Sequence, residues 1–178
     1  MKKTCLALAV ALVLAIFSVS AQAASASGTL TVTATVTGSI NLVFNSDTNG
    51  VVLTGTGTST ATLAFGSVMA YGTCPTHVTC TPAATNFAVS SPVDVAVYEY
   101  NSSSTSYTLT AALNASDATD TWAVNGVTIT TTPATITSTG AYTTTGTGTN
   151  YPVQITIPYT VTNGTNISNK INYTATSN

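Results

Sequence analysis

The residues from Tyr151 to Val161 alternate between large apolar side chains and proline or polar side chains. A period of two places the apolar set on one face of a β-strand. Ile155 and Ile157 should therefore face a hydrophobic core, and Thr156 should face the solvent.

The two prolines of this segment suggest where its strand lies in a sheet. Residues two apart point their N–H groups to the same lateral side, so Pro152 and Pro158 both lack a donor on one side. Proline is found mainly at sheet edges for this reason. We therefore predict an open edge along this strand, comprising Pro152, Gln154, Thr156 and Pro158.

The same alternation recurs along most of the chain, in short segments separated by turn residues. The other segments expected to form strands are 29–44, with an interruption at Gly38, then 51–54, 61–65, 87–91, 93–100, 107–113, 122–130, a weak one near Ile136, and 167–175. Asn125-Gly126 is a preferred type I′ turn pair, so residues 122–130 should form a tight hairpin. Many short strands without an amphipathic helix predict an all-β protein, an immunoglobulin-like antiparallel β-sandwich of about 8–10 strands.

The N-terminus has the three parts of a secretory signal peptide. Lys2 and Lys3 precede an apolar run from about Leu6 to Val19, and Ala21-Gln22-Ala23 follows as a small-residue cleavage site. A membrane anchor is the alternative, but the run is short for a span and no charged flank follows it. We expect residues 1–23 to be a helical signal peptide and residues 24–178 a single exported domain, extracellular, at the cell surface or periplasmic, with no remaining membrane span.

The expected mature chain is almost free of charge. After residue 23 it has one cation, Lys170, against five acidic residues, and the chain has no arginine. Nucleic-acid binding requires a basic patch and is excluded. About 40 residues are threonine, which suits the outer face of a strand. A disordered glycosylated stalk would also be rich in Thr and Ser, but regular apolar alternation favours a folded β-protein.

Cys74, His77 and Cys80 are the one group of soft metal ligands, spaced three residues apart. Such a group could hold copper or zinc, but a closed zinc site needs a fourth ligand, and the expected mature chain has no other histidine or cysteine. Neighbouring cysteines of exported proteins normally form a disulfide. We predict a Cys74–Cys80 disulfide that closes a local loop, with His77 exposed on it.

The remaining polar residues do not form a convincing active site. Nucleophilic catalysis requires a base, and His77 is the only histidine. Asp117 and Asp120 lie in a polar loop, and Asp94 and Glu99 have opposite parity on one strand, so they face opposite ways. We therefore expect a protein that is not an enzyme and that has no cofactor and no metal site.

Two stretches resemble secreted bacterial β-sandwich proteins of the spore coat U and fimbrial-subunit families. They are LAFGSVMAYGT and the closing IPYTVTNGTNISNKINYTATSN, with matching positions at Leu63, Phe65, Gly66 and Tyr173. The resemblance implies an immunoglobulin-like sandwich in a surface filament or coat, without a cofactor. The disulfide typical of these families links an early strand to a later one, whereas Cys74 and Cys80 can close only a local loop.

Two classes of function fit the sequence. The first is a structural subunit of a bacterial surface fibre, fimbria or coat. Its partners would be copies of itself or related subunits, with a periplasmic chaperone if it is fimbrial. Such a subunit could donate a strand to its neighbour through alternating N-terminal residues, which are Leu30, Val32, Ala34 and Val36. Alternatively, residues 29–37 pair within their own chain, because Gly38 lets the segment fold straight back.

The second class is a monomeric adhesin or carbohydrate-binding domain. It would use exposed aromatic side chains, for which the candidates are Trp122, Tyr98, Tyr100 and Tyr142. Trp122 begins a strand, where burial in the core is the expected fate of a tryptophan. A map of exposed aromatic residues separates the two classes.

Overall fold

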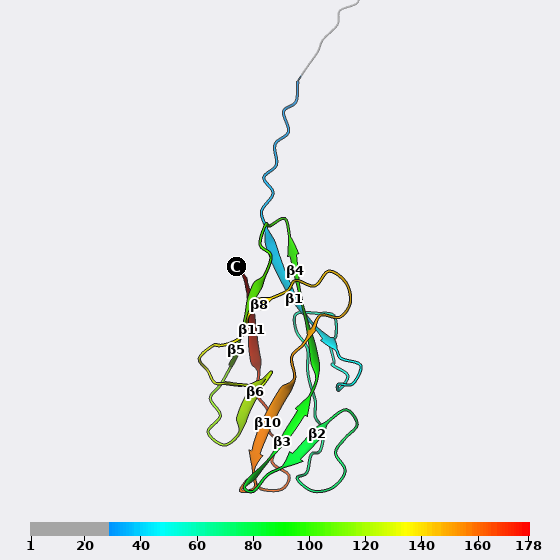
Figure 1. Cartoon of the computed structure of the whole chain (residues 1–178), viewed down its shortest axis with the longest axis vertical. Helices are drawn as coiled ribbons and strands as arrows, with labels where there is room; N and C mark the ends of the chain where they lie inside the picture. The colour runs from blue at the N-terminus through cyan, green and yellow to red at the C-terminus, as the bar shows by residue number, and fades with distance from the viewer. Residues whose placement is uncertain (1–28) are drawn as a thin grey trace, which may run out of the picture. The chain divides into compact units, whose positions relative to one another are not determined.

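The computed structural model describes residues 29–178, which form eleven strands in three antiparallel sheets (Figure 1). The strands are β1 (Ser39–Ser46), β2 (Thr79–Pro82), β3 (Asn86–Ser91), β4 (Val93–Tyr100), β5 (Tyr107–Leu113), β6 (Thr121–Val124), β7 (Val127–Ile129), β8 (Ala134–Gly140), β9 (Thr149–Asn150), β10 (Val153–Pro158) and β11 (Ile171–Ser177). The expected all-β antiparallel sandwich is confirmed. The predicted signal peptide, residues 1–23, lies outside the described residues.

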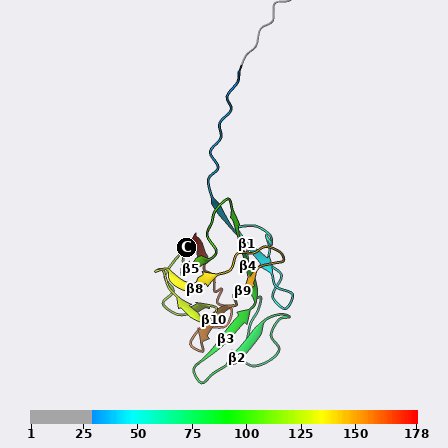
Figure 2. The same cartoon turned by 45° about the horizontal axis from the view of Figure 1, so that its top comes forward.

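The strand orders in the three sheets are β1-β4-β9, β2-β3-β10-β6-β7 and β11-β5-β8. The first two sheets are continuous along the chain, because β3 is separated from β4 only by Pro92, and β9 from β10 only by Tyr151 and Pro152. The Tyr151 amide donates to the Val93 carbonyl at 2.8 Å, so the pairing continues where the chain passes between sheets. Figure 2, which views the structure from a second direction, also shows that β3 leads into β4.

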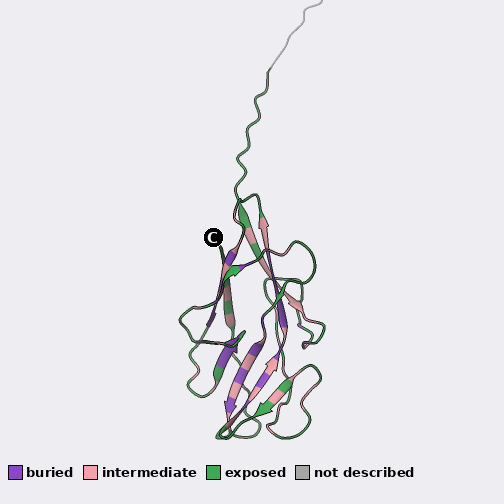
Figure 3. Ribbon diagram, in the orientation of Figure 1, coloured by how far each residue is buried: buried purple, intermediate pink, exposed green. Residues whose placement is uncertain are grey.

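The core lies where the inward faces of these sheets meet. Val95 and Val97 of β4 and Tyr107 and Leu109 of β5 are fully buried. Buried positions follow β4, β5 and β10 in Figure 3, alternating along β10 with more exposed ones. A compact unit extends from Val36 to Asn178.

The predicted orientation of the 151–161 strand is confirmed. Along β10 the buried positions are Val153, Ile155 and Ile157, and Thr156 between them is less buried. The predicted 122–130 hairpin is also confirmed: β6 pairs with β7, and Asn125 and Gly126 have φ values of 50° and 76°, as a type I′ turn requires.

The predicted open edge at Pro152, Gln154, Thr156 and Pro158 is wrong, because β10 pairs with β3 on one side and with β6 on the other. The absent N–H groups of Pro152 and Pro158 do fall on the same lateral side of the chain. The Pro152 carbonyl accepts from Asn125 after β6, whereas the Tyr159 amide donates to Thr85 before β3. Both prolines therefore face β6. This short strand pairs only with Val153–Thr156, between the two prolines, so no hydrogen bond is lost.

The first predicted strand begins later than expected. Residues 29–38 belong to no strand, and β1 starts at Ser39. Alternation determines which side chains would share a face, but a strand also needs a hydrogen-bonded neighbour. No helix among residues 29–178 is long and apolar enough to cross a membrane.

Candidate functional site

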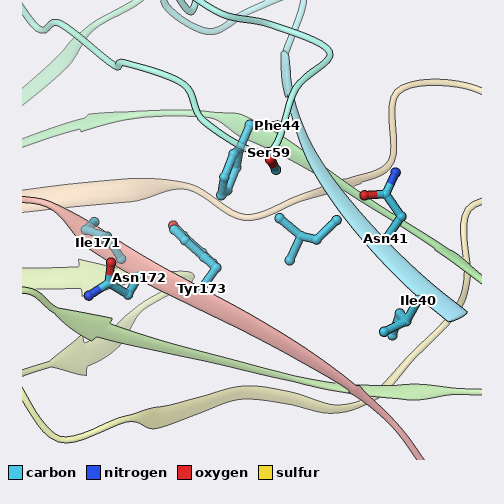
Figure 4. A pocket seen from close by; sticks show the side chains of 8 residues that line it. Ile40, Asn41, Phe44, Ser59, Ile171, Asn172 and Tyr173 are labelled. Carbon is cyan, nitrogen blue, oxygen red and sulfur yellow. The ribbon is translucent and has the colours of Figure 1, made fainter.

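A groove lies between the first and last strands, β1 and β11, and we call it the β1/β11 groove. Among the strands of residues 29–178, each of the two pairs on one side only: β1 pairs with β4, and β11 pairs with β5. On its other side, β1 is bridged to the loop at Phe44 and Thr58. A pocket of about 330 Å³ opens between them. Its lining residues are Ile40, Asn41, Leu42, Phe44, Ser59, Ile171, Asn172 and Tyr173. In Figure 4 the rings of Phe44 and Tyr173 occupy the space between the two strands.

Alternation in β1 and β11 produces the apolar lining. Ile40, Leu42 and Phe44 share one face of β1 and pack at partial burial against the core. Ile171, Tyr173 and Ala175 do the same from β11. Apolar side chains half buried in a sheet-edge gap are what a further strand would cover.

The backbone of β1 faces this groove with unpaired groups. Phe44 donates its N–H to the Thr58 carbonyl at 2.8 Å and accepts from the Gly57 amide at 2.7 Å. Its peptide groups therefore point away from β4, and those of Ile40 and Leu42, which have the same parity, point the same way. Within residues 29–178, neither Ile40 nor Leu42 has a backbone partner on that side.

The backbone of β11 faces the groove in the same manner. Lys170 accepts from Asn114 at 2.8 Å and Asn178 donates to Ser106 at 3.1 Å, so the even-numbered residues face β5. The odd-numbered residues consequently turn their peptide groups to the groove. These are Ile171, Tyr173, Ala175 and Ser177, and they have no other backbone partner among the described residues. Unpaired edges of this kind are a template for an added strand.

Aromatic contact partly closes the groove. Phe44 and Tyr173 meet edge to face with ring centroids 5.1 Å apart. Burial raises the pKa of the Tyr173 phenol above its ordinary value of 10.0. The Tyr173 hydroxyl therefore lies in surroundings that disfavour its charged form.

The predicted donor residues are exposed and unpaired in the part of the chain that the structure describes. Leu30, Val32 and Val36 are 86%, 81% and 72% exposed, and Ala34 between them is also exposed. These four apolar side chains alternate along a segment that forms no strand. They are an exposed apolar surface of the kind that would be buried if the segment paired with a sheet edge.

The Cys74–Cys80 disulfide is confirmed. His77 is exposed between the two cysteines with a φ of 64°, as expected for a loop residue. Among residues 29–178, no group of three or more His, Cys, Asp or Glu residues is arranged to hold a metal ion.

Of the aromatic residues proposed for sugar binding, Trp122 is buried and Tyr100 is exposed, while Tyr98 and Tyr142 are partly buried. The Trp122 indole donates to Asp117 at 2.8 Å, and Asp117 also accepts from the amides of Thr119 and Asp120. Burial opposes ionisation of Asp117, but these three hydrogen bonds outweigh it and lower the pKa of this carboxyl. Asp117 is therefore a structural anchor for its loop.

The chain matches no protein-family model, and no curated protein or solved structure is significantly similar to it.

Sequence reasoning missed the β1/β11 groove. It identified the alternating residues on both strands, including Tyr173, but assigned the open edge to residues 151–161. Within residues 29–178, β1 is the first strand and β11 the last, but the sequence predicted a strand starting at residue 29 and so gave no signal for this edge. The Asp117 turn did have a signal, since an Asp in a polar loop commonly accepts from the backbone amide two positions later.

Proposed function

We propose that this protein is a structural subunit of a bacterial surface fibre, fimbria or coat, assembled by strand donation. Residues 29–37 of one copy would lie in the β1/β11 groove of the next. The observation that carries the proposal is a groove with unpaired backbone on both sides, in a chain whose alternating N-terminal segment belongs to no strand.

The chemistry of the two surfaces is complementary. An added strand would offer N–H and C=O groups to Ile40 and Leu42 on one side and to β11 on the other, while its alternate side chains entered the apolar space. Leu30, Val32, Ala34 and Val36 supply those side chains, and the threonines between them would face the solvent. None of the residues that line the groove is charged, and neither is any of residues 29–37.

The geometry of such a contact leads to polymerisation. The donated segment and the groove are different parts of one chain, so the contact is heterologous and can repeat without closing. A signal peptide fits assembly outside the cytoplasm, and the resemblance to spore coat U and fimbrial subunits favours the same reading. An uncovered edge is prone to aggregation, which gives a periplasmic chaperone a reason to cover the groove before assembly.

The experiment compares the mature protein with a variant that lacks residues 25–37, using sedimentation to measure size and circular dichroism to measure folding. We expect multimers from the wild type and a folded monomer from the deletion variant. A wild type that stays monomeric, combined with a deletion variant that unfolds, would show that the segment completes its own domain.

A peptide of residues 29–37 provides a matched test. It should bind the deletion variant, because it supplies the missing strand. The same peptide with Val32→Asp should not bind, since it would place a charge in the apolar groove.

A specific observation supports carbohydrate binding as a second candidate. Tyr71, which is 73% exposed, stacks on Tyr159 with ring centroids 6.2 Å apart, and Tyr159 stacks in turn on the buried Phe87. An exposed, supported ring could bind the apolar face of a sugar. Titration with a β-linked glucose oligomer should shift the ring resonances of Tyr71 in wild type and produce no binding in Tyr71→Ala.

A further inference from the structure

Two exposed tyrosine side chains meet at the surface of the domain. The hydroxyl oxygens of Tyr71 and Tyr159 are 3.4 Å apart, and the two rings stack with centroids 6.2 Å apart and an angle of 28° between their planes. Both rings are exposed, so a reagent in the solvent can reach them. The two residues lie 88 positions apart along the chain, so it is the fold that brings them together.

Tyr159 is held in place from its other side. Its ring stacks on Phe87 of β3 with centroids 6.1 Å apart, and its hydroxyl donates to the Ala83 carbonyl at 3.0 Å. Tyr71, in contrast, lies in the segment 63–78, which belongs to no strand. The Tyr71 ring is therefore the one that can shift, and it can shift toward a partner that is fixed.

We propose that Tyr71 and Tyr159 are a modification site, at which a haem peroxidase acting with hydrogen peroxide joins the two rings into a dityrosine. The peroxide takes one electron and one proton from each phenol and becomes two molecules of water. The two phenoxyl radicals then form one carbon–carbon bond between ring positions next to the hydroxyls. The hydrogen on each bonded carbon moves to the oxygen of the same ring, so both phenols are restored and the protein has lost two hydrogen atoms.

The position of the two rings favours this bond over links between copies. Radicals held side by side react as neighbours, and their effective concentration far exceeds that of a second protein molecule. A buried pair provides an internal comparison: the Tyr107 and Tyr151 hydroxyls are 3.3 Å apart, but both residues are buried. The peroxidase reaches only surface phenols, so the buried pair should remain unlinked.

The dityrosine would restrict the chain far more than the disulfide does. It would close a loop between residues 71 and 159, whereas Cys74 and Cys80 are only six positions apart. Closing a longer loop removes more freedom from the unfolded chain. The link should therefore raise the denaturation midpoint, and it forms within one copy whether or not the protein assembles.

The experiment treats the folded mature protein with a haem peroxidase and hydrogen peroxide. We expect dityrosine fluorescence, an intact mass lower by two hydrogen atoms, and single chains under denaturing conditions. A protease that cuts before aspartate locates the link, because Tyr71 is the only tyrosine of fragment 47–93 and Tyr159 lies in fragment 120–178. These two fragments should be joined, and fragment 94–116, which contains three other tyrosines, should be free.

Phenylalanine variants assign the link to its two residues. Tyr71→Phe and Tyr159→Phe keep the rings and remove the phenols, so each should abolish the joined fragments while circular dichroism stays as in wild type. Tyr100→Phe, at an exposed tyrosine outside the pair, should leave the yield unchanged.

The possible contrary results are distinct. Joined fragments that persist in Tyr159→Phe overturn the assignment to that residue, and covalent multimers without an internal link overturn the modification site. An unchanged intact mass overturns it as well. A linked protein whose denaturation midpoint equals that of the untreated protein overturns the stabilising role of the link.

Discussion

Phe44 of β1 and Tyr173 of β11 meet edge to face at a boundary that no strand-to-strand hydrogen bonding crosses in the described chain. Side chains, and not a ladder, hold these two edges near each other. The same pair therefore supports the sandwich and limits what can enter the groove.

A double-mutant cycle should detect this contact. Phe44→Ala and Tyr173→Ala should each destabilise the protein, and their effects should differ from additivity by about 0.5–1.5 kcal/mol, the usual worth of an aromatic pair. Denaturant unfolding gives the four free energies. Tyr71, which stacks on Tyr159 instead, is the control partner for Phe44. Coupling of equal size with Tyr71→Ala would mean that the cycle reports a general loosening of the domain.

Ile155 on β10 should be among the most sensitive positions in the core. It is 6% exposed, so Ile155→Ala should cost roughly 2–5 kcal/mol of unfolding free energy by leaving a cavity. Thr156→Ala on the opposite face should change stability by about 0.5 kcal/mol or less. Equal denaturation midpoints for Ile155→Ala and wild type would contradict the inward orientation of this side chain.

Stability should fall in alkaline solution. Burial raises the pKa of Tyr173, and burial with the Tyr107 hydroxyl 3.3 Å away raises that of Tyr151. In the unfolded chain both phenols lose their protons near pH 10, while the folded protein retains them. The unfolded state then binds fewer protons, so the free energy of unfolding decreases as pH rises above about 10.

Denaturant midpoints measured between about pH 8 and about pH 11 test this sign. Tyr173→Phe should make the alkaline decline shallower, because it removes one of the phenols whose pKa is raised in the folded protein. If Tyr173→Phe does not change the slope, groups other than Tyr173 cause the loss of stability at alkaline pH.

The sequence indicated which side chains of a strand face the core, but it did not indicate which strands lie beside it. The period of two identified Ile155 and Ile157 as core residues, and Asn125-Gly126 identified a hairpin, because both are local properties of the chain. The lateral partner of a strand depends on residues far away. Thus the parity of Pro152 and Pro158 was right, but β6 fits between them and removes the edge.

The groove was beyond sequence reasoning for the same reason. Nothing in Ile171, Tyr173 or Ala175 indicates that β5 lies on one side of them and no strand on the other. The segments predicted as strands at 51–54 and 61–65 show a related limit. They meet only at the Thr54–Thr62 bridge, because the intervening Gly and Thr residues form a loop too irregular to continue the pairing.

The pairing of β1 with β4 has a consequence for how the domain would bear a mechanical load. Eight residue pairs, from Ser39 with Tyr100 to Ser46 with Val93, join the two strands along their length. A pull on the chain just before Ser39 that is directed along β1 would strain these hydrogen-bonded pairs together and would not separate them one at a time. Resistance to forced extension depends on the unfolding rate, so a domain loaded in shear in this way should yield abruptly and as a unit.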